Sequence, residues 1–238
     1  MLPIKSAVPV RYPPLATWSL IAINCVVFLF ETSLSEAQLE EFLSQFALVP
    51  SHFSDPTEVA DYLPFVSNMF LHGGWLHLIL NMWTLWVFGP PVEDQFGWRL
   101  YLVFYLFCGV LASVTHVVFN PTSTIPALGA SGAIAGILGC YMRLFPQARV
   151  IVMIPVMFIP LFFALPGAVF VGLWFLMQVL QATTSLFLPS AGGSIAWWAH
   201  IGGFVGGFAL ASPLRFTARS NWPRHADQGI LGFDLMGR

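Results

Sequence analysis

The stretch Leu128–Gly136, which reads LGASGAIAG, places a serine and three glycines at the start of a long apolar run. Ser131 is surrounded by Gly129, Gly132 and Gly136. A hydroxyl among glycines is an unusual beginning for a segment that otherwise has the composition of a membrane-spanning helix. The role of this hydroxyl therefore depends on what the rest of the chain brings close to it.

The composition of the whole chain indicates a protein that crosses a lipid bilayer several times. Of 238 residues, 57% are hydrophobic and 8% are charged, whereas about a quarter of the residues of a soluble domain are charged. The mean hydropathy is +0.77 over the entire chain. A net charge of −2 favours no nucleic-acid partner. No cleavable leader is recognised before the first hydrophobic segment.

Hydropathy predicts an all-α polytopic membrane protein. A spanning helix needs about 20 apolar residues with a rise of 1.5 Å each. Clear candidates lie at about residues 16–33, 75–90, 99–119, 129–146 and 195–213. The tract 150–182 is too long for one span, and three prolines interrupt its first half. It holds either two short spans or one span from about Ala164, preceded by a broken segment at the membrane surface.

The positions of the lysines and arginines decide whether the chain has six or seven spans, that is, whether the tract 150–182 holds one span or two. With one span in the tract 150–182, every lysine and arginine falls on the same side as both termini: Lys5, Arg11, Arg99, Arg143, Arg149, Arg215, Arg219, Arg224 and Arg238. The first loop, 34–74, lies on the other side and is acidic. Loops rich in lysine and arginine stay in the cytoplasm. A six-transmembrane-helix bundle with cytoplasmic N and C termini is therefore predicted.

This layout divides the chain into a short cytoplasmic tail (1–15), a six-helix membrane domain (16–213) and a cytoplasmic C-terminal tail (214–238). The first loop, 34–74, is the large extracytoplasmic piece. We expect an integral multi-pass protein of a bacterial inner membrane. No oligomeric state is predicted.

Polar groups at membrane depth are functional candidates, and four polar side chains inside the predicted spans are singled out here. His77 and Asn81 are four residues apart, so they share one face of the second helix. Ser131 begins the fourth helix and His200 lies near the start of the sixth. Because these three helices all enter from the extracytoplasmic side, the four side chains are expected at a similar depth near the outer leaflet.

Each residue also has a structural interpretation when it is taken alone. A serine at a helix start is commonly an N-cap, and a histidine or asparagine in a membrane helix often joins two helices by a hydrogen bond. Small residues spaced four apart more often indicate close helix packing than chemistry. Such pairs occur among Gly129, Gly132, Gly136, Gly203 and Gly207. The shared depth of the polar residues favours a common site, and close packing at the glycines would bring Ser131 and His200 together.

The available residue types are those of a serine nucleophile with a histidine base. Aspartate and glutamate occur only at the ends of the predicted spans, as Glu31 and Glu93 do, so a Ser131–His200 dyad is the most that the sequence offers. The backbone N–H of Ser131, in the first helical turn, and the side chains of His77 and Asn81 are candidate donors to an oxyanion.

Other catalytic schemes lack their residues. The chain has no HExxH sequence, and Ala133 stands where a GxSxG elbow needs glycine. A metal site built from His72, His77, His116 and His200 would lack carboxylate or thiolate support. The three cysteines lie in apolar runs and favour neither disulfides nor zinc. Neither a metal nor a cofactor is expected.

Three segments in combination resemble the rhomboid intramembrane serine proteases: LHGGWLHLILNMWTLWVFGPPVEDQFG (71–97), LGASGAIAGILG (128–139) and WWAHIGGFVGG (197–207). The resemblance covers about residues 16–214. It implies a six-helix protease, without cofactor, that cleaves single-span membrane proteins near the outer end of their helix. It makes Ser131 the nucleophile, His200 the base and His77 with Asn81 the oxyanion donors. Glu93 matches a structural glutamate.

The chain also departs from some members of the family. Ala135 occupies a position where some carry a tyrosine that stacks on the histidine, so His200 needs another support, for which Trp197, Trp198 and Tyr141 are candidates. The segment 183–194, rich in small residues, is a candidate mobile cap, and a substrate helix is expected to approach between the second and fifth spans. The alternatives are a non-catalytic relative that binds transmembrane helices and a transporter with a site at the bilayer midplane.

Overall fold

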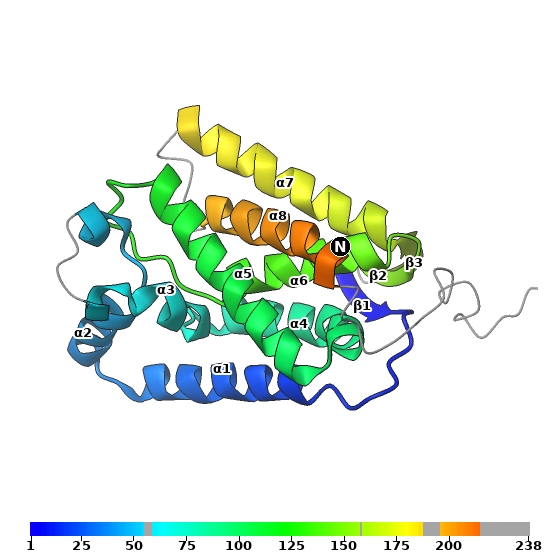
Figure 1. Ribbon diagram of the computed structural model, residues 1–238, viewed down its shortest axis with the longest axis horizontal. Coiled ribbons are helices and arrows are strands. Elements are labelled where there is room, and N and C mark those ends of the chain that lie inside the picture. The colour runs from blue at the N-terminus through cyan, green and yellow to red at the C-terminus, as the bar shows by residue number, and fades with distance from the viewer. Residues whose placement is uncertain (55–58, 158, 188–195, 215–238) are drawn as a thin grey trace, which may run out of the picture.

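The computed structural model describes residues 1–54, 59–157, 159–187 and 196–214. Six long helices run roughly along one axis in alternating directions (Figure 1). They are α1 (Leu15–Ser33), α4 (Trp75–Phe96), α5 (Trp98–Phe119), α6 (Ser131–Leu144), α7 (Gly167–Phe187) and α8 (Trp197–Leu214). The predicted segments at 16–33 and 99–119 match two of these helices almost residue for residue.

Three of the helices, α1, α5 and α7, are long and apolar enough to cross a membrane by length and composition. Helix α6 is apolar but has only 14 residues. Helix α4 continues beyond the predicted end at residue 90 to Phe96, through Pro90 and Pro91. Gly97, with φ of 74°, then separates α4 from α5, and glycine adopts this backbone conformation without the steric cost of a side chain.

The segment between α1 and α4 consists of short helical pieces. They are α2 (Glu36–Phe46), η1 (Pro50–Ser54), η2 (Val59–Tyr62), α3 (Pro64–Ser67) and η3 (Asn68–Phe70). Helix α2 begins at a capping box, in which Ser35 and Gln38 each accept a hydrogen bond from the backbone of the other. These pieces lie toward the end of the bundle at which α6 and α8 begin (Figure 1).

The prediction of an all-α protein needs a correction, because the structure contains a three-stranded antiparallel sheet. Its order is β1 (Leu2–Ser6), β2 (Arg149–Val156) and β3 (Ile159–Pro166). Strand β1 lies in the predicted N-terminal tail and pairs with the first half of β2. Strand β2 is rich in β-branched residues, which favour strands. It pairs with β1 on one side and with β3 on the other.

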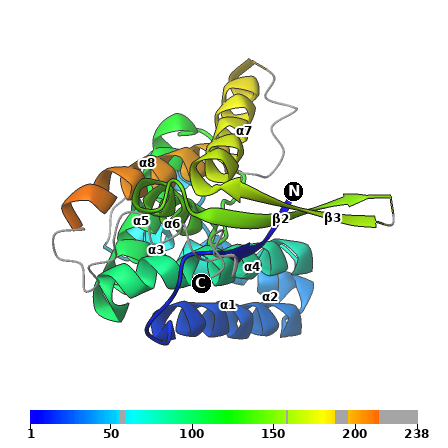
Figure 2. The ribbon, with the colours of Figure 1, turned by 90° about the vertical axis from the view of Figure 1, so that its right-hand side faces the viewer.

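The tract expected to hold a broken surface segment is instead the hairpin β2–β3, and α7 begins at Gly167 rather than Ala164. The hairpin projects sideways beyond the helices (Figure 2). Its two faces both carry apolar side chains, and those of Met157, Ile159 and Phe162 are exposed. The prolines that break a helix are tolerated at the rim of a sheet, where Pro155 and Pro160 face each other across the turn.

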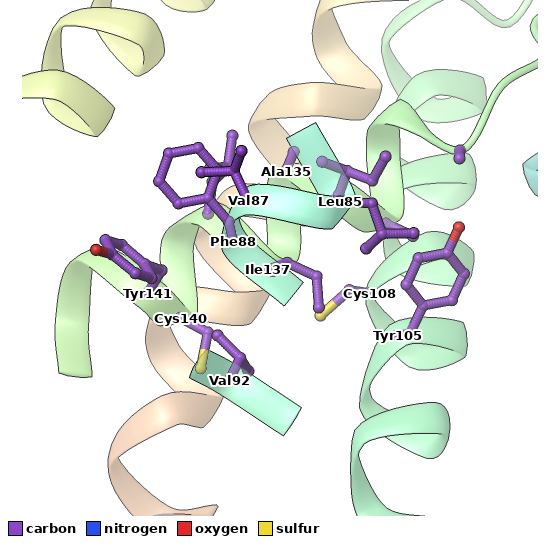
Figure 3. Close-up of a cluster of buried hydrophobic side chains, with 14 of the residues drawn as sticks. Leu85, Val87, Phe88, Val92, Tyr105, Cys108, Ala135, Ile137, Cys140 and Tyr141 are labelled. Carbon is purple, nitrogen blue, oxygen red and sulfur yellow. The ribbon is translucent and has the colours of Figure 1, made fainter. Parts of the chain in front are cut away.

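The hydrophobic core lies between α4, α5 and α6 (Figure 3). Leu85 and Phe88 from α4, Cys108 from α5 and Ala135 from α6 are among its fully buried members. This core holds α6 in the middle of the bundle, so the residue at the start of α6 is surrounded by other helices. Residues 215–238 of the predicted C-terminal tail and residues 188–194 of the predicted cap lie outside the described residues.

Candidate active site

Ser131 is the first residue of α6, and the backbone just before it is fitted to a neighbouring helix. Gly129 has a φ of +127°, which side chains rarely allow. A Cβ atom at Gly129 would lie 2.7 Å from Cε1 of His77 and 3.6 Å from Nδ2 of Asn81. The absence of a side chain at Gly129 therefore lets the imidazole and the amide of α4 approach the loop that leads into Ser131.

Helices α6 and α8 touch through their backbones. A side chain at Gly203 would overlap the carbonyl group of Gly132, and one at Gly207 would overlap that of Gly136. On its other side, a Cβ atom at Gly136 would lie 2.6 Å from Sγ of Cys108 on α5. Close approach at small residues is the usual packing of membrane helices. Here the close approach brings the starts of α6 and α8 so near to each other that short side chains on the two helices can touch.

His200 and Ser131 meet at this contact. Nε2 of His200 lies 2.8 Å from Oγ of Ser131, a distance typical of a hydrogen bond. The two residues are 69 positions apart in the chain and come from different helices. His200 is buried, with 8% of its surface exposed. A serine hydroxyl paired with a buried imidazole is the arrangement that proton transfer from the hydroxyl requires.

The other nitrogen of His200 has a partner that the sequence analysis did not include. Nδ1 of His200 lies 2.8 Å from Oε1 of Gln178, which comes from α7 and is also buried. Gln178 is a polar residue within an apolar span, so the criterion that selected His77 and Asn81 also selects it. Its contact with His200 joins two helices, and spacing along the chain does not reveal it.

Of the three aromatic residues expected to support His200, one lies near it. The ring of Trp197 is edge-on to the imidazole, with centroids 6.1 Å apart. Trp198 instead stacks on Phe119, and the Tyr141 hydroxyl bonds to Ser6 near the opposite end of α6. Trp174 of α7, with its ring centroid 6.0 Å from that of His200, completes the surroundings of the imidazole.

Asn81 presents an amide nitrogen that has no hydrogen-bond partner in the part of the chain that the structure describes. Its Nδ2 is buried and unpaired, whereas buried polar groups in proteins are almost always paired. The ring of His77 lies on the same side of α4, next to Gly129, and is 5.2 Å from the ring of His72. The structure thus brings both predicted donors of α4 to the loop beside Ser131, with at least one N–H group available.

A small cavity, lined in part by Ser131, lies at the start of α6. Its lining includes the polar side chains of Asn68, Ser113 and His116 together with Gly132. The volume of about 20 Å³ is enough for one water molecule. Among the described residues, no three histidine, cysteine, aspartate or glutamate side chains are arranged to hold a metal ion.

Glu93 lies far from this constellation, at the other end of α4. Its carboxylate accepts hydrogen bonds from the backbone N–H groups of Ala16 and Thr17, each at 2.8 Å, and from the Thr17 hydroxyl at 2.7 Å. Ala16 and Thr17 belong to the first turn of α1, where N–H groups lack partners within the helix. Glu93 therefore caps α1 and fixes it to α4.

Comparison with known proteins identifies the family of this chain. The family model for the rhomboid domain matches residues 60–215, which include α4 to α8 and all four polar residues. The chain belongs to the rhomboid family. Membership makes it an integral membrane protein, and its largely helical fold with three clear membrane-spanning candidates is consistent with that.

Several curated rhomboid proteins are similar over large parts of the chain. Rhomboid protein 1, mitochondrial, from Saccharomyces cerevisiae is 27% identical over 201 residues, which is 82% of this chain and 52% of the relative. Presenilin-associated rhomboid-like protein A, mitochondrial, from Danio rerio is 33% identical over 46% of the chain and 29% of the relative. Rhomboid protease GluP from Bacillus subtilis is 31% identical over 60% and 24%. The chain thus spans about half of the yeast protein and less of the others.

Proposed function

We propose that this rhomboid protein is a serine endopeptidase that cleaves single-span membrane proteins near the extracytoplasmic end of their transmembrane helix. The observation that carries the proposal is the 2.8 Å contact between Ser131 Oγ and His200 Nε2. Two helices bring these groups together by backbone contact at glycines, so their geometry is set by the fold rather than by flexible side chains. Ser131 acts as the nucleophile and His200 as the base.

The reaction follows from the two side chains. Oγ of Ser131 attacks the carbonyl carbon of the scissile peptide bond while Nε2 of His200 takes the hydroxyl proton. The tetrahedral intermediate breaks its C–N bond as His200 returns that proton to the leaving amine, which leaves an ester on Ser131. A water molecule then attacks the ester carbonyl while His200 takes one of its protons. The ester C–O bond breaks, His200 returns the proton to Oγ of Ser131, and the new carboxylic acid leaves.

The negative oxygen of the intermediate needs donors that are already in place. The backbone N–H of Ser131 is in the first turn of α6, where it has no partner within the helix. Nδ2 of Asn81 is buried and unpaired, and the ring of His77 lies beside the same loop at Gly129. We assign the oxyanion site to these three groups. An unpaired donor costs stability in the resting protein, which is understandable where an oxygen binds during the reaction.

We further propose that all six long helices cross the membrane and that both termini are cytoplasmic. The alternating directions of the helices and the position of the N-terminus toward the end of the bundle where α8 ends support this layout (Figure 1). Residues 1–15, 16–213 and 214–238 are then the N-terminal tail, protease domain and C-terminal tail. Ser131 and His200 face the extracytoplasmic half, and a substrate helix reaches them between α4 and α7.

Labelling by a fluorophosphonate tests the chemistry without knowledge of the natural substrate. The purified wild-type protein is expected to be labelled, whereas Ser131→Ala and His200→Ala are not. In liposomes, only the wild-type protein should cleave a tagged single-span protein. Folding of each variant is checked by circular dichroism and thermal unfolding. Equal cleavage by wild type and Ser131→Ala would end the assignment, and a folded wild type that neither labels nor cleaves would indicate a non-catalytic helix-binding relative.

The membrane in which the protein resides is also a proposal. Relatives with the same domain come from mitochondria and from Bacillus subtilis. We retain a bacterial inner membrane as the expected location, because six spans with cations on one side fit insertion from the cytoplasm. Fractionation of a tagged protein in its source cells tests this location.

A further inference from the structure

We infer that Gln178 is a positioning residue that holds the neutral imidazole of His200 in the tautomer needed for catalysis. This inference rests on the proposed Ser131–His200 chemistry and goes beyond it, because the third group is an amide from α7 rather than a carboxylate. Gln178 and His200 have 7% and 8% of their surfaces exposed. The contact between Nδ1 of His200 and Oε1 of Gln178 is 2.8 Å long.

The hydrogen bonds that link Trp174, Gln178, His200 and Ser131 form a series. The carbonyl oxygen of Trp174 fixes which group donates in each of them. Nε2 of Gln178 lies 3.2 Å from the carbonyl oxygen of Trp174, one helical turn earlier on α7. A carbonyl oxygen can only accept, so the nitrogen end of the Gln178 amide must face Trp174 and the oxygen end must face His200. The backbone of α7 thereby fixes which way the amide points.

The same reasoning sets the tautomer of His200. Oε1 of Gln178 can only accept, so Nδ1 of His200 must carry the proton and donate it. In a neutral imidazole the other nitrogen is then unprotonated. Nε2, 2.8 Å from the Ser131 hydroxyl, is left as the acceptor of that hydroxyl proton. The chain from Trp174 to Ser131 thus prepares His200 to act as a base.

An amide at this position could fail if it turned around, and the fold opposes that. With the amide reversed, Oε1 of Gln178 would face the Trp174 carbonyl oxygen, and two acceptors would meet without a proton. The NH₂ group would then donate to Nδ1 of His200 and move the ring proton to Nε2, which could no longer accept from Ser131. The Trp174 carbonyl therefore favours the productive orientation and disfavours the unproductive one.

The position of Gln178 on α7 is also consistent with a specific role rather than with surface polarity. The residues of α7 that are buried with it include Val171 and Ala182, which lie on the same helix face as Gln178. Gln181, one turn further on, is exposed. Gln178 is the buried glutamine that faces α8, and Gln181 supplies a natural comparison on the same helix.

Two substitutions of nearly equal size separate positioning from packing. Gln178→Met keeps the length of the side chain but removes the acceptor, whereas Gln178→Glu keeps an acceptor oxygen toward Nδ1. Gln181→Met is the matched control. We expect Gln178→Met to slow fluorophosphonate labelling by about 10- to 100-fold, the loss of one hydrogen bond to a group that becomes charged in the reaction. The labelling rate of Gln178→Glu should stay within about tenfold of the wild-type rate, and the rate of Gln181→Met should equal the wild-type rate.

With a single-span substrate, the loss in Gln178→Met should appear in kcat while KM stays near its wild-type value, because the contact does not touch substrate. Thermal unfolding of each variant supplies the folded fraction, by which rates are normalised. A Gln178→Met rate equal to wild type, or one equal to or faster than that of Gln178→Glu, would overturn the inference. Ser131→Ala is run in parallel. If Ser131→Ala is still labelled, the proposed function fails. If Ser131→Ala is not labelled but Gln178→Met is labelled at the wild-type rate, only the inference about Gln178 fails.

Discussion

Gly203 of α8 lies so close to the carbonyl group of Gly132 on α6 that no side chain fits between the two helices. This contact sets the separation of the helices that carry His200 and Ser131. We expect Gly203→Ala to push α8 away from α6, to lower the unfolding temperature and to reduce Ser131-dependent labelling by at least about tenfold, since a displacement near 1 Å is costly to catalysis. Labelling and thermal unfolding measure the two effects.

The matched control for this substitution is Gly172→Ala on α7. A Cβ atom at Gly172 would meet only the flexible end of Met142, at 3.9 Å, which is an ordinary contact. An alanine in a helix is favoured over glycine by about 1 kcal/mol, so this variant should be as stable as wild type or more so. Equal behaviour of the two alanine variants would mean that the α6–α8 contact does not position the site.

The unpaired amide of Asn81 leads to a second prediction. Asn81→Ala removes a buried donor that has no partner in the resting protein, so the unfolding temperature should stay the same or rise. If Nδ2 binds the oxyanion, kcat should fall by about 100- to 1,000-fold while KM changes little. Steady-state cleavage of a single-span substrate decides this, and a large fall in stability with unchanged kcat would assign Asn81 to helix packing instead.

A third prediction concerns the carboxylate of Glu93, which accepts three hydrogen bonds from the first turn of α1. Glu93→Ala should lower stability by roughly 2–4 kcal/mol, because hydrogen bonds to a charged group and its interaction with the helix dipole are lost together. Labelling per folded molecule should be unchanged, since Glu93 lies far from Ser131. Glu36→Ala, at an exposed carboxylate in the first turn of α2, is the control and should be nearly neutral.

The dependence of stability on pH follows from His72, in the loop before α4. Burial, with a contribution from nearby His77, lowers the pKa of His72 from 6.5 to about 4. Between these pH values the unfolded chain binds a proton that the folded protein does not, so stability should fall as the pH drops from about 6.5 to 4. The full effect is at most about 3 kcal/mol.

His72→Leu should flatten this decline, whereas the same substitution at exposed His52 should leave it in place. Unfolding temperatures at pH 7.5 and at pH 5 for the three proteins are sufficient for the comparison. If wild type and His72→Leu lose stability in parallel on acidification, the decline comes from other groups.

The β2–β3 hairpin is apolar on both faces and is attached at each end to a long apolar helix. A soluble partner would cover one face and leave the other in water, whereas a bilayer surrounds both. The unpaired edge of β3 does not suit the hydrocarbon centre. We therefore expect the turn to lie in the interfacial region. A fluorophore at Met157→Cys, with Cys25 replaced, should be quenched by lipids brominated near the headgroup; a label at Glu36→Cys should not be.

Much of the helical framework could be predicted from the sequence, because a membrane-spanning helix is recognised from the length and hydropathy of its segment alone. The segments 16–33 and 99–119 illustrate this, and the polar residues Ser131, His77, Asn81 and His200 stood out against that apolar background. The hairpin could not be predicted in the same way: apart from Arg149, the strands Arg149–Val156 and Ile159–Pro166 are apolar, so they lack the alternation by which a strand is recognised.

The third member of the site was missed for a different reason. Gln178 and His200 are 22 residues apart and belong to different helices, so their contact depends on how α7 is rotated against α8. That rotation is set by which residues pack, such as Val171 and Ala182, and no local pattern in the chain expresses it. The candidate aromatic supports were chosen from residues near His200 or Ser131 in sequence, and only Trp197 proved close in space.

The brevity of α6 has a consequence for where peptide bonds can be cut. Its 14 residues give a rod of about 21 Å, whereas the apolar layer of a bilayer is about 30 Å thick. If all six helices cross the membrane as proposed, a rod of that size is too short to reach both surfaces of the apolar layer, so one of its ends lies below a surface. We expect that end to be the one that carries Ser131 and expect water to reach it from the outer aqueous phase, past the longer neighbouring helices, which would explain how hydrolysis can occur below the membrane surface.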